Sequence, residues 1–252
     1  MTVLAATDCS VSTVDGTPLL ADVSLAVDPG ETVVVAGPSG SGKTVLTKAL
    51  GGLVENRPNL TVGGTVERPD DVGFLFLNPT TQLVRRTVEH DAAFGLENQG
   101  VPREEMGARI RTWADRLNAT RFLDRRVDQL SRGETAVVAL LGSLVTEPDL
   151  VILDEPLAPL DHPNRQLVLE TIEALQAQGT ALIVTEHDLR DVLSLADRLL
   201  VLEEGRVTGR GQPRDLVSTL HSFGLRLPFP TEVALERGTA PDAMPLRSEG
   251  GP

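Results

Sequence analysis

A glycine-rich segment, GPSGSGKT at Gly37 to Thr44, constrains the fold of this chain more than any other feature. It fits the pattern G-x-x-x-x-G-K-[ST] at every required position, follows the apolar run Thr32 to Ala36 and precedes a plausible helix, Lys43 to Leu50. Glycines let backbone amides converge on phosphate oxygens, and a helix N-terminus adds partial positive charge. The strand, loop and helix therefore predict a phosphate loop that binds a nucleotide.

Within this loop, Lys43 is expected to reach the β- and γ-phosphates and Thr44 to hold Mg²⁺. The alternative, a glycine-rich strand-to-helix turn without a ligand, is disfavoured because both the motif and its context agree. The predicted nucleotide-binding residues are Gly37, Pro38, Ser39, Gly40, Ser41, Gly42, Lys43 and Thr44.

Charge and composition exclude several classes of function. The formal net charge of the 252 residues is −13, which argues against a protein that binds the phosphate backbone of nucleic acids. The longest apolar run, Ala136 to Leu141, is far too short to span a membrane, and we expect no secretory signal. The lone cysteine, Cys9, cannot form an internal disulfide, so a cytosolic protein is expected.

Apolar runs bounded by turn signals alternate with segments of helical spacing, which predicts a mostly parallel sheet covered on both faces. The first thirty residues look instead like a small antiparallel lobe. The region from about 87 to 140 is expected to be an inserted α-helical lobe, with Trp113 in its core. We expect one domain over residues 1–237 and a disordered tail over 238–252. The runs predicted as buried strands are Thr32 to Ala36, Val72 to Phe76, Leu150 to Leu153, Thr180 to Thr185 and Leu199 to Leu202.

The segment DLVILDEP places two carboxylates, Asp154 and Glu155, at the end of an apolar strand. On a strand beside the phosphate-loop strand, Asp154 could bind Mg²⁺ through water, and Glu155 could polarise an attacking water. The alternative is a helix-capping Asp-Glu-Pro turn, which carries little weight after a phosphate loop.

Further motifs resemble ATP-binding cassette (ABC) ATPases. The segment LSRGE, which starts at Leu130, resembles the family's signature motif. The segment APLD, from Ala158, resembles its dimer-contacting loop, and IVTEHD, from Ile183, resembles the segment that carries its switch histidine. The resemblance spans about residues 4–207 and implies a P-loop NTPase (RecA-like) α/β fold with the two lobes above, ATP and Mg²⁺ as cofactors, and a second ABC ATPase subunit, identical or not. It implies Glu155 and His187 as catalytic residues and Thr44 and Asp154 as Mg²⁺ ligands. It also implies that the signature contacts the partner's ATP; the signature residues are Ser131, Arg132, Gly133 and Glu134.

A narrower resemblance, to energy-coupling-factor importers and their cobalt- and nickel-type relatives, rests on FLNPTTQLVRRTVEHDAAFGLEN and the later FGLRLPFPTEVAL. It implies an ATPase at the cytoplasmic face of the membrane that drives uptake of a vitamin or transition-metal ion. The implied partners are a transmembrane coupling subunit and a substrate-binding membrane subunit, and no nucleic acid. Leu77, Asn78 and Gln82 fall in its Q-loop region, where the membrane partner is sensed.

The chain departs from the family pattern at several positions. Leu77 stands where a glutamine usually contacts Mg²⁺ and the attacking water, and Asn78 or Gln82 could substitute. In the signature, Arg132 replaces a usual glycine and Glu134 a usual glutamine. Val137 replaces a usual arginine, and the aromatic residue that stacks on adenine is missing near Thr13.

These departures leave two alternatives open. The chain could be a degenerate half of a heterodimer that binds ATP but hydrolyses it poorly, which Leu77 favours and the intact Glu155 and His187 oppose. A cassette acting on DNA or ribosomes is disfavoured by the acidic charge, by the lack of a long coiled-coil insertion and by the presence of a single cassette. The remaining histidines, His90, His162 and His221, show no metal-ligand spacing.

Overall fold

The computed structural model describes residues 2–55, 57–240 and 243–246. Its strands are β1 (Leu4–Thr13), β2 (Pro18–Val27), β3 (Thr32–Ala36), β4 (Leu60–Glu67), β5 (Val72–Leu75), β6 (Leu150–Asp154), β7 (Ala181–Glu186), β8 (Arg198–Glu203) and β9 (Arg206–Gly211). Its α-helices are α1 (Lys43–Leu50), α2 (Val88–Asn98), α3 (Arg103–Arg116), α4 (Arg132–Leu144), α5 (His162–Ala177), α6 (Pro213–Ser222) and α7 (Phe229–Glu236). Short 3₁₀ turns lie at Pro79–Thr81, Thr120–Phe122, Val127–Gln129 and Leu193–Leu195.

The central sheet carries the candidate site at its edge. Its strand order is β5-β6-β7-β3-β8-β9, with all neighbours parallel except β8 and β9, which pair antiparallel. Every residue of β3, β6 and β7 is buried, as expected for parallel strands covered on both faces. The predicted α/β fold is confirmed, and the carboxyl ends of these strands meet at one edge.

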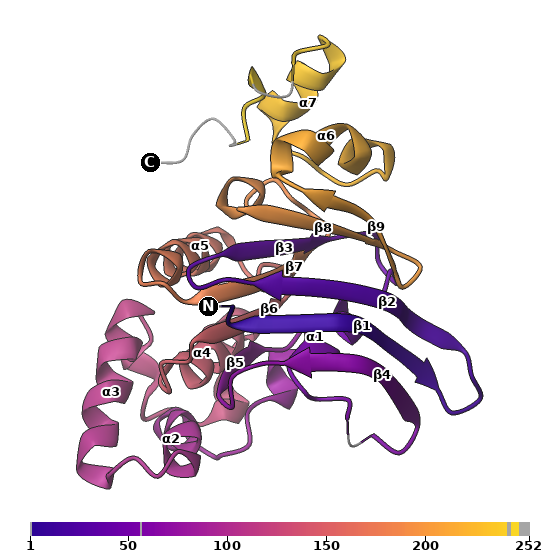
Figure 1. Ribbon diagram of the computed structural model, residues 1–252. Helices are drawn as coiled ribbons and strands as arrows, with labels where there is room; N and C mark the ends of the chain where they lie inside the picture. Colours follow the sequence, from indigo (N-terminus) through magenta and orange to yellow (C-terminus); the bar gives the residue numbers. More distant parts are fainter. Residues whose placement is uncertain (1, 56, 241–242, 247–252) are drawn as a thin grey trace.

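A second sheet, of order β2-β1-β4, is antiparallel and lies over one face of the central sheet (Figure 1). Inward-facing residues of β1, including Leu4, Cys9 and Val11, form one hydrophobic core with Leu46 and Leu50 of α1. The antiparallel lobe expected in the first thirty residues therefore gains a third strand, β4, from a later segment. The free Cys9 is buried in this core.

Helices cover the opposite face of the central sheet. Between β5 and β6 the chain forms α2, α3 and α4, and these pack with the sheet into a second core that includes Ile110, Trp113 and Leu117 (Figure 1). Trp113 is 5% exposed, as predicted for a core residue, and the guanidinium of Arg116 lies 4.8 Å from the centre of its ring. The helical segment places α4 at its end, beside β5.

The C-terminal part of the chain, α6 and α7, follows the edge strand β9 (Figure 1). Met244 is 4% exposed, and the Thr231 hydroxyl donates to the carbonyl of Pro245, so residues 243–246 pack against α7. The other residues of the expected disordered tail beyond 240 lie outside the described part of the chain. Among the described residues, no helix has both the length and the apolar character needed to cross a membrane.

Candidate functional site

The loop between β3 and α1 can be formed only with glycine at two positions. A Cβ on Gly37 would lie 2.2 Å from the carbonyl oxygen of Leu202, and Gly42 has φ of 104°, in the left-handed region. Gly42 is the N-cap of α1, which runs over Lys43–Leu50 as predicted. The backbone amides at the start of this helix therefore face the loop, as a phosphate site requires.

Lys43 lies inside this loop and is surrounded by oxygen atoms. Its side chain is 4% exposed, and its Nζ donates to the carbonyls of Gly37 at 2.9 Å and Pro38 at 3.1 Å. Nζ also lies 3.3 Å from Oε1 of Glu155. The ammonium group thus occupies a pocket of oxygen acceptors at the mouth of the loop, where phosphate oxygens can replace them.

Asp154 ends β6 and is 1% exposed. Its Oδ1 accepts a hydrogen bond of 2.8 Å from the Thr185 hydroxyl, whereas its buried Oδ2 has no hydrogen-bond partner in the described structure. Burial raises the pKa of Asp154, and the hydrogen bond from Thr185 and the nearby Thr44 hydroxyl oppose that shift. A buried carboxylate oxygen without a partner, close to the Thr44 hydroxyl, fits a cation ligand.

The expectation that the strand of Asp154 lies beside the phosphate-loop strand is wrong. Strand β7 lies between β6 and β3, and Asp154 pairs with Thr185 of β7. The apolar runs predict which segments form strands but contain no information about their order in the sheet. Asp154 instead approaches Thr44 of α1 across the carboxyl end of β7.

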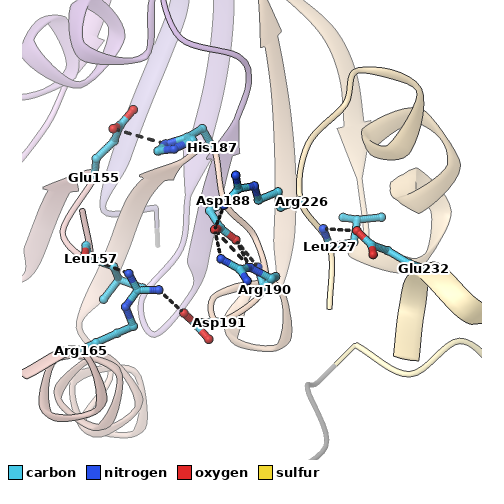
Figure 2. Close-up of polar contacts among 10 residues, drawn as sticks. All are labelled: Glu155, Leu157, Arg165, His187, Asp188, Arg190, Asp191, Arg226, Leu227 and Glu232. Atoms are coloured by element: carbon cyan, nitrogen blue, oxygen red, sulfur yellow. Dashed lines mark hydrogen bonds and ion pairs between the residues drawn. The ribbon is translucent and has the colours of Figure 1, made fainter. Parts of the chain in front are cut away.

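Glu155 joins two of the other predicted site residues. Its Oε1 contacts Lys43, and its Oε2 lies 3.5 Å from Nδ1 of His187, as Figure 2 shows. Its backbone has φ of 50°, an uncommon conformation for a residue with a side chain. The Glu155 amide donates to the hydroxyl and carbonyl oxygens of Thr185 at 3.0 and 3.2 Å, which fixes this conformation.

Thr185 is therefore a site residue that the sequence patterns did not identify. It is fully buried, and its hydroxyl contacts both Asp154 and the Glu155 amide. The available signal was a hydroxyl residue, Thr185, near the end of the apolar run ALIVTE at Ala181 to Glu186. Polar groups buried at the end of a strand need partners, and here those partners are the two acidic site residues.

The Q-loop region does not provide a glutamine at the phosphate loop. Gln82 accepts from the Phe76 amide at 3.2 Å and donates to the Ala139 carbonyl at 3.2 Å and to the Ser143 hydroxyl at 2.9 Å. Its amide is therefore bound to the residue that follows β5 and to α4, which disfavours Gln82 as the substitute for the missing glutamine. Leu77 is 43% exposed, and Asn78 is also exposed.

The signature residues begin α4. Ser131 is the N-cap and forms a capping box with Glu134: the Ser131 hydroxyl accepts from the Glu134 amide, and Glu134 accepts from the Ser131 amide at 2.7 Å. Glu134 also pairs with Arg125 at 2.9 Å, and Arg132 is exposed. Within the described residues, no hydrogen bond or ion pair links residues 131–134 to the phosphate loop or to Glu155.

This arrangement, a phosphate loop on a parallel sheet with an acidic pair at the next strand but one, defines a P-loop nucleoside triphosphatase. The sequence profile of the ABC transporter family matches residues 20–158. A putative ABC transporter ATP-binding protein of Halobacterium salinarum is 45% identical over 82% of this chain and 92% of its own length. The energy-coupling factor transporter ATP-binding protein EcfA1 of Enterococcus faecalis is 38% identical over 94% of this chain and 90% of its own length.

Among solved structures, cbiO1 from Clostridium perfringens, described as part of the ABC transporter complex cbiONQ, superposes with a TM-score of 0.74. It is 26% identical, and the match covers 94% of this chain and 99% of that one. The chain belongs to the ABC transporter family. It is an ATP-binding protein of the kind that hydrolyses ATP for a transporter, which confirms the resemblance seen in the sequence motifs.

Proposed function

We propose that this chain is the ATP-hydrolysing subunit of an importer of the energy-coupling-factor type, which takes up a vitamin or a transition-metal ion. The observation that carries the proposal is the Glu155 carboxylate, held between Lys43 and His187 at the mouth of the phosphate loop. The names of the relatives support the transporter type, and the cbiONQ complex of the structural neighbour supports membrane partners.

The arrangement suggests how the residues act on ATP. The loop amides and Lys43 bind the β- and γ-phosphates, so the Lys43 ammonium exchanges its contact with Glu155 for phosphate oxygens. Glu155 is then free to accept a proton from the attacking water, and His187 contacts the γ-phosphate and Glu155. Thr44 and Asp154 are the residues that would hold Mg²⁺, which supplies positive charge to the phosphates. The unpartnered Oδ2 of Asp154 supports this assignment.

The signature is proposed to act on the ATP of a second subunit. In the part of the chain that the structure describes, no hydrogen bond or ion pair joins the signature to the chain's own phosphate loop, so a facing cassette, identical or not, would complete each ATP site. The signature residues are Ser131, Arg132, Gly133 and Glu134. Closure of the two subunits on ATP would then drive transport. The alternative of a degenerate, weakly hydrolysing half is favoured by Leu77, and the contacts of Glu155 with Lys43 and His187 oppose it.

Exposed apolar side chains support a docking site for a transmembrane coupling subunit. Among the described residues, Leu77, Val84 and Phe94 are large apolar side chains that are 43%, 63% and 38% exposed. They lie in one stretch from the Q-loop region into α2. Exposed apolar side chains that form a contiguous patch commonly mark protein interfaces. With a substrate-binding membrane subunit as a third partner, docking through this stretch would place the chain at the cytoplasmic side of the membrane.

The proposal is tested by purifying the tagged chain from membranes and identifying what accompanies it. Co-purification of an integral membrane subunit, with ATP-dependent uptake of a labelled vitamin or of Co²⁺ or Ni²⁺, supports it. Lys43→Ala should abolish that uptake, whereas Lys48→Ala, the only other lysine, should retain most of it. Uptake by Lys43→Ala at the parent rate would contradict the phosphate-loop assignment.

A further inference from the structure

Both backbone polar groups of Leu157, two residues after Glu155, form hydrogen bonds that lead to the segment around His187. Its amide donates to Oε1 of Glu186 at 3.2 Å. Its carbonyl accepts from Nη2 of Arg165, on α5, at 3.5 Å. Nη1 of the same arginine pairs with Oδ2 of Asp191 at 2.8 Å, as Figure 2 shows.

These contacts connect the two loops that carry the proposed catalytic residues. Glu186 directly precedes His187 in the chain, and Asp191 follows it by four positions. Leu157 belongs to the segment that leaves β6 through Glu155. The loop after β6 is thus joined to the chain on both sides of His187, once directly and once through Arg165.

The residues that connect the two loops are buried or partly buried, which limits their motion. Leu157 is 3% and Glu186 is 2% exposed, and the side chains of Arg165 and Asp191 are about one-third exposed, at 33% and 30%. A guanidinium can bind a carboxylate and a carbonyl at the same time through its rigid fork of donors. Arg165 therefore fixes the distance between the two loops more firmly than a single surface ion pair would.

The residues directly after His187 are also anchored. Asp188 pairs with Arg190 at 2.6 Å and lies 3.7 Å from Arg226, which precedes α7 (Figure 2). The Leu189 amide donates to the Arg226 carbonyl at 2.8 Å. With these contacts already present, the links through Glu186 and Arg165 set where the loop lies relative to Glu155.

We propose that Arg165 and Asp191 are positioning residues that set the geometry between Glu155 and His187. The inference rests on the proposed role of Glu155 as the base. The two site residues are 3.5 Å apart and lie on separate loops, and misplacement by about 1 Å costs on the order of a hundredfold in rate. No hydrogen bond or ion pair in the described structure joins Arg165 or Asp191 to the phosphate loop, so ATP affinity is independent of this pair.

The test compares Arg165→Leu, Asp191→Asn and the double variant in the complex with the native partners. Each single variant should lower kcat by about tenfold, since part of the positioning remains through Glu186, while KM for ATP and the affinity for a non-hydrolysable ATP analogue stay unchanged. The double variant should lose no more than Arg165→Leu alone, because the two residues act as one unit. Arg165→Lys, which keeps the charge opposite Asp191, should recover part of kcat.

Two controls keep the outcomes distinct. Arg206→Leu removes an exposed ion pair with Asp22, of 3.8 Å, and should leave kcat unchanged. Glu155→Gln should slow hydrolysis by at least about a hundredfold. An unchanged kcat in a folded Arg165→Leu overturns the inference, as does a loss of ATP affinity equal to the loss of kcat. Full activity in Glu155→Gln would instead contradict the proposed function itself.

Discussion

Leu77 occupies a position at which a polar side chain would be expected to face the attacking water, and the structure offers no glutamine in its place because Gln82 is bound elsewhere. We predict that Leu77→Gln raises kcat and leaves ATP affinity nearly unchanged. One preorganised polar contact in the transition state is worth about 2.7–4 kcal/mol, which corresponds to roughly a hundredfold or more in rate. Steady-state ATPase activity of the complex measures the effect.

Asn78 provides the control for this prediction. It is exposed and adjacent to Leu77, and its side chain does not cap the following 3₁₀ turn. If Leu77→Gln is no faster than the parent and Asn78→Ala is much slower, Asn78 already fills the role and Leu77 does not limit the rate.

Glu186 provides a pH-dependent measurement. Burial raises the pKa of its carboxyl from 4.5 to about 8, although the Leu157 amide donates to it. Between these pH values the folded protein keeps a proton that the unfolded chain releases. The contribution of the protonated Glu186 carboxyl to the free energy of unfolding is therefore complete below the lower pKa and is lost as the pH rises through about 8.

Glu186→Gln keeps an acceptor for the Leu157 amide but cannot ionise. We predict that urea midpoints of the parent decrease from mildly acidic to mildly alkaline pH and that those of Glu186→Gln decrease less. Parallel pH profiles for the two proteins would show that the Glu186 carboxyl is already ionised in the folded protein.

At the scale of elements, Gln82 connects Phe76, the residue that follows β5, to α4, the helix that begins with the signature. Replacing it with the near-isosteric methionine leaves the Phe76 amide without its acceptor. We expect a loss in the free energy of unfolding of about 1–3 kcal/mol, as for other unsatisfied buried groups. Gln99→Met is the matched control, because the Gln99 side chain bonds to Asp71 at an exposed position.

Chemical denaturation of both variants measures this loss. If Gln82→Met kept the parent's stability but lost ATPase activity, Gln82 would act at the ATP site after all, and the contacts with α4 would not define its role.

Elements with strong local signals were predictable from sequence, and their arrangement was not. The strand β3, the phosphate loop and α1 have the predicted limits because glycines and apolar runs act locally. The position of β7 between β6 and β3 depends on the packing of crossover helices, and no local pattern encodes it. Helices α6 and α7 were also missed, since their short apolar stripes lie among prolines and glycines.

Some residues of the candidate site were likewise predictable from the sequence, and others were not. Lys43, Asp154, Glu155 and His187 were identified because each lies in a short motif, and the structure brings Lys43 and His187 to Glu155. Thr185 and the ion pair between Arg165 and Asp191 were not identified from the sequence, because the residues that they contact lie far along the chain. Arg165 and Asp191 are 26 residues apart, and only the folded sheet brings them together.

At the scale of the whole molecule, one chain carries a phosphate loop with its acidic pair and a signature, and among the described residues no hydrogen bond or ion pair joins the signature to that loop. Two chains facing each other would supply both parts to each ATP. The exposed Arg132 at the start of α4 would then lie at the partner's phosphates, where its charge is suited to anions.

The most direct test of this account is single-turnover ATP hydrolysis by the parent and by Glu155→Gln, with size measured by gel filtration in the presence of ATP. The account predicts that Glu155→Gln binds ATP, hydrolyses it at least about a hundredfold more slowly and elutes as a stable dimer of ATPase subunits, because a general base of this kind contributes about 10²–10⁴ in rate. Hydrolysis at the parent rate, with no ATP-dependent change in elution, would contradict it.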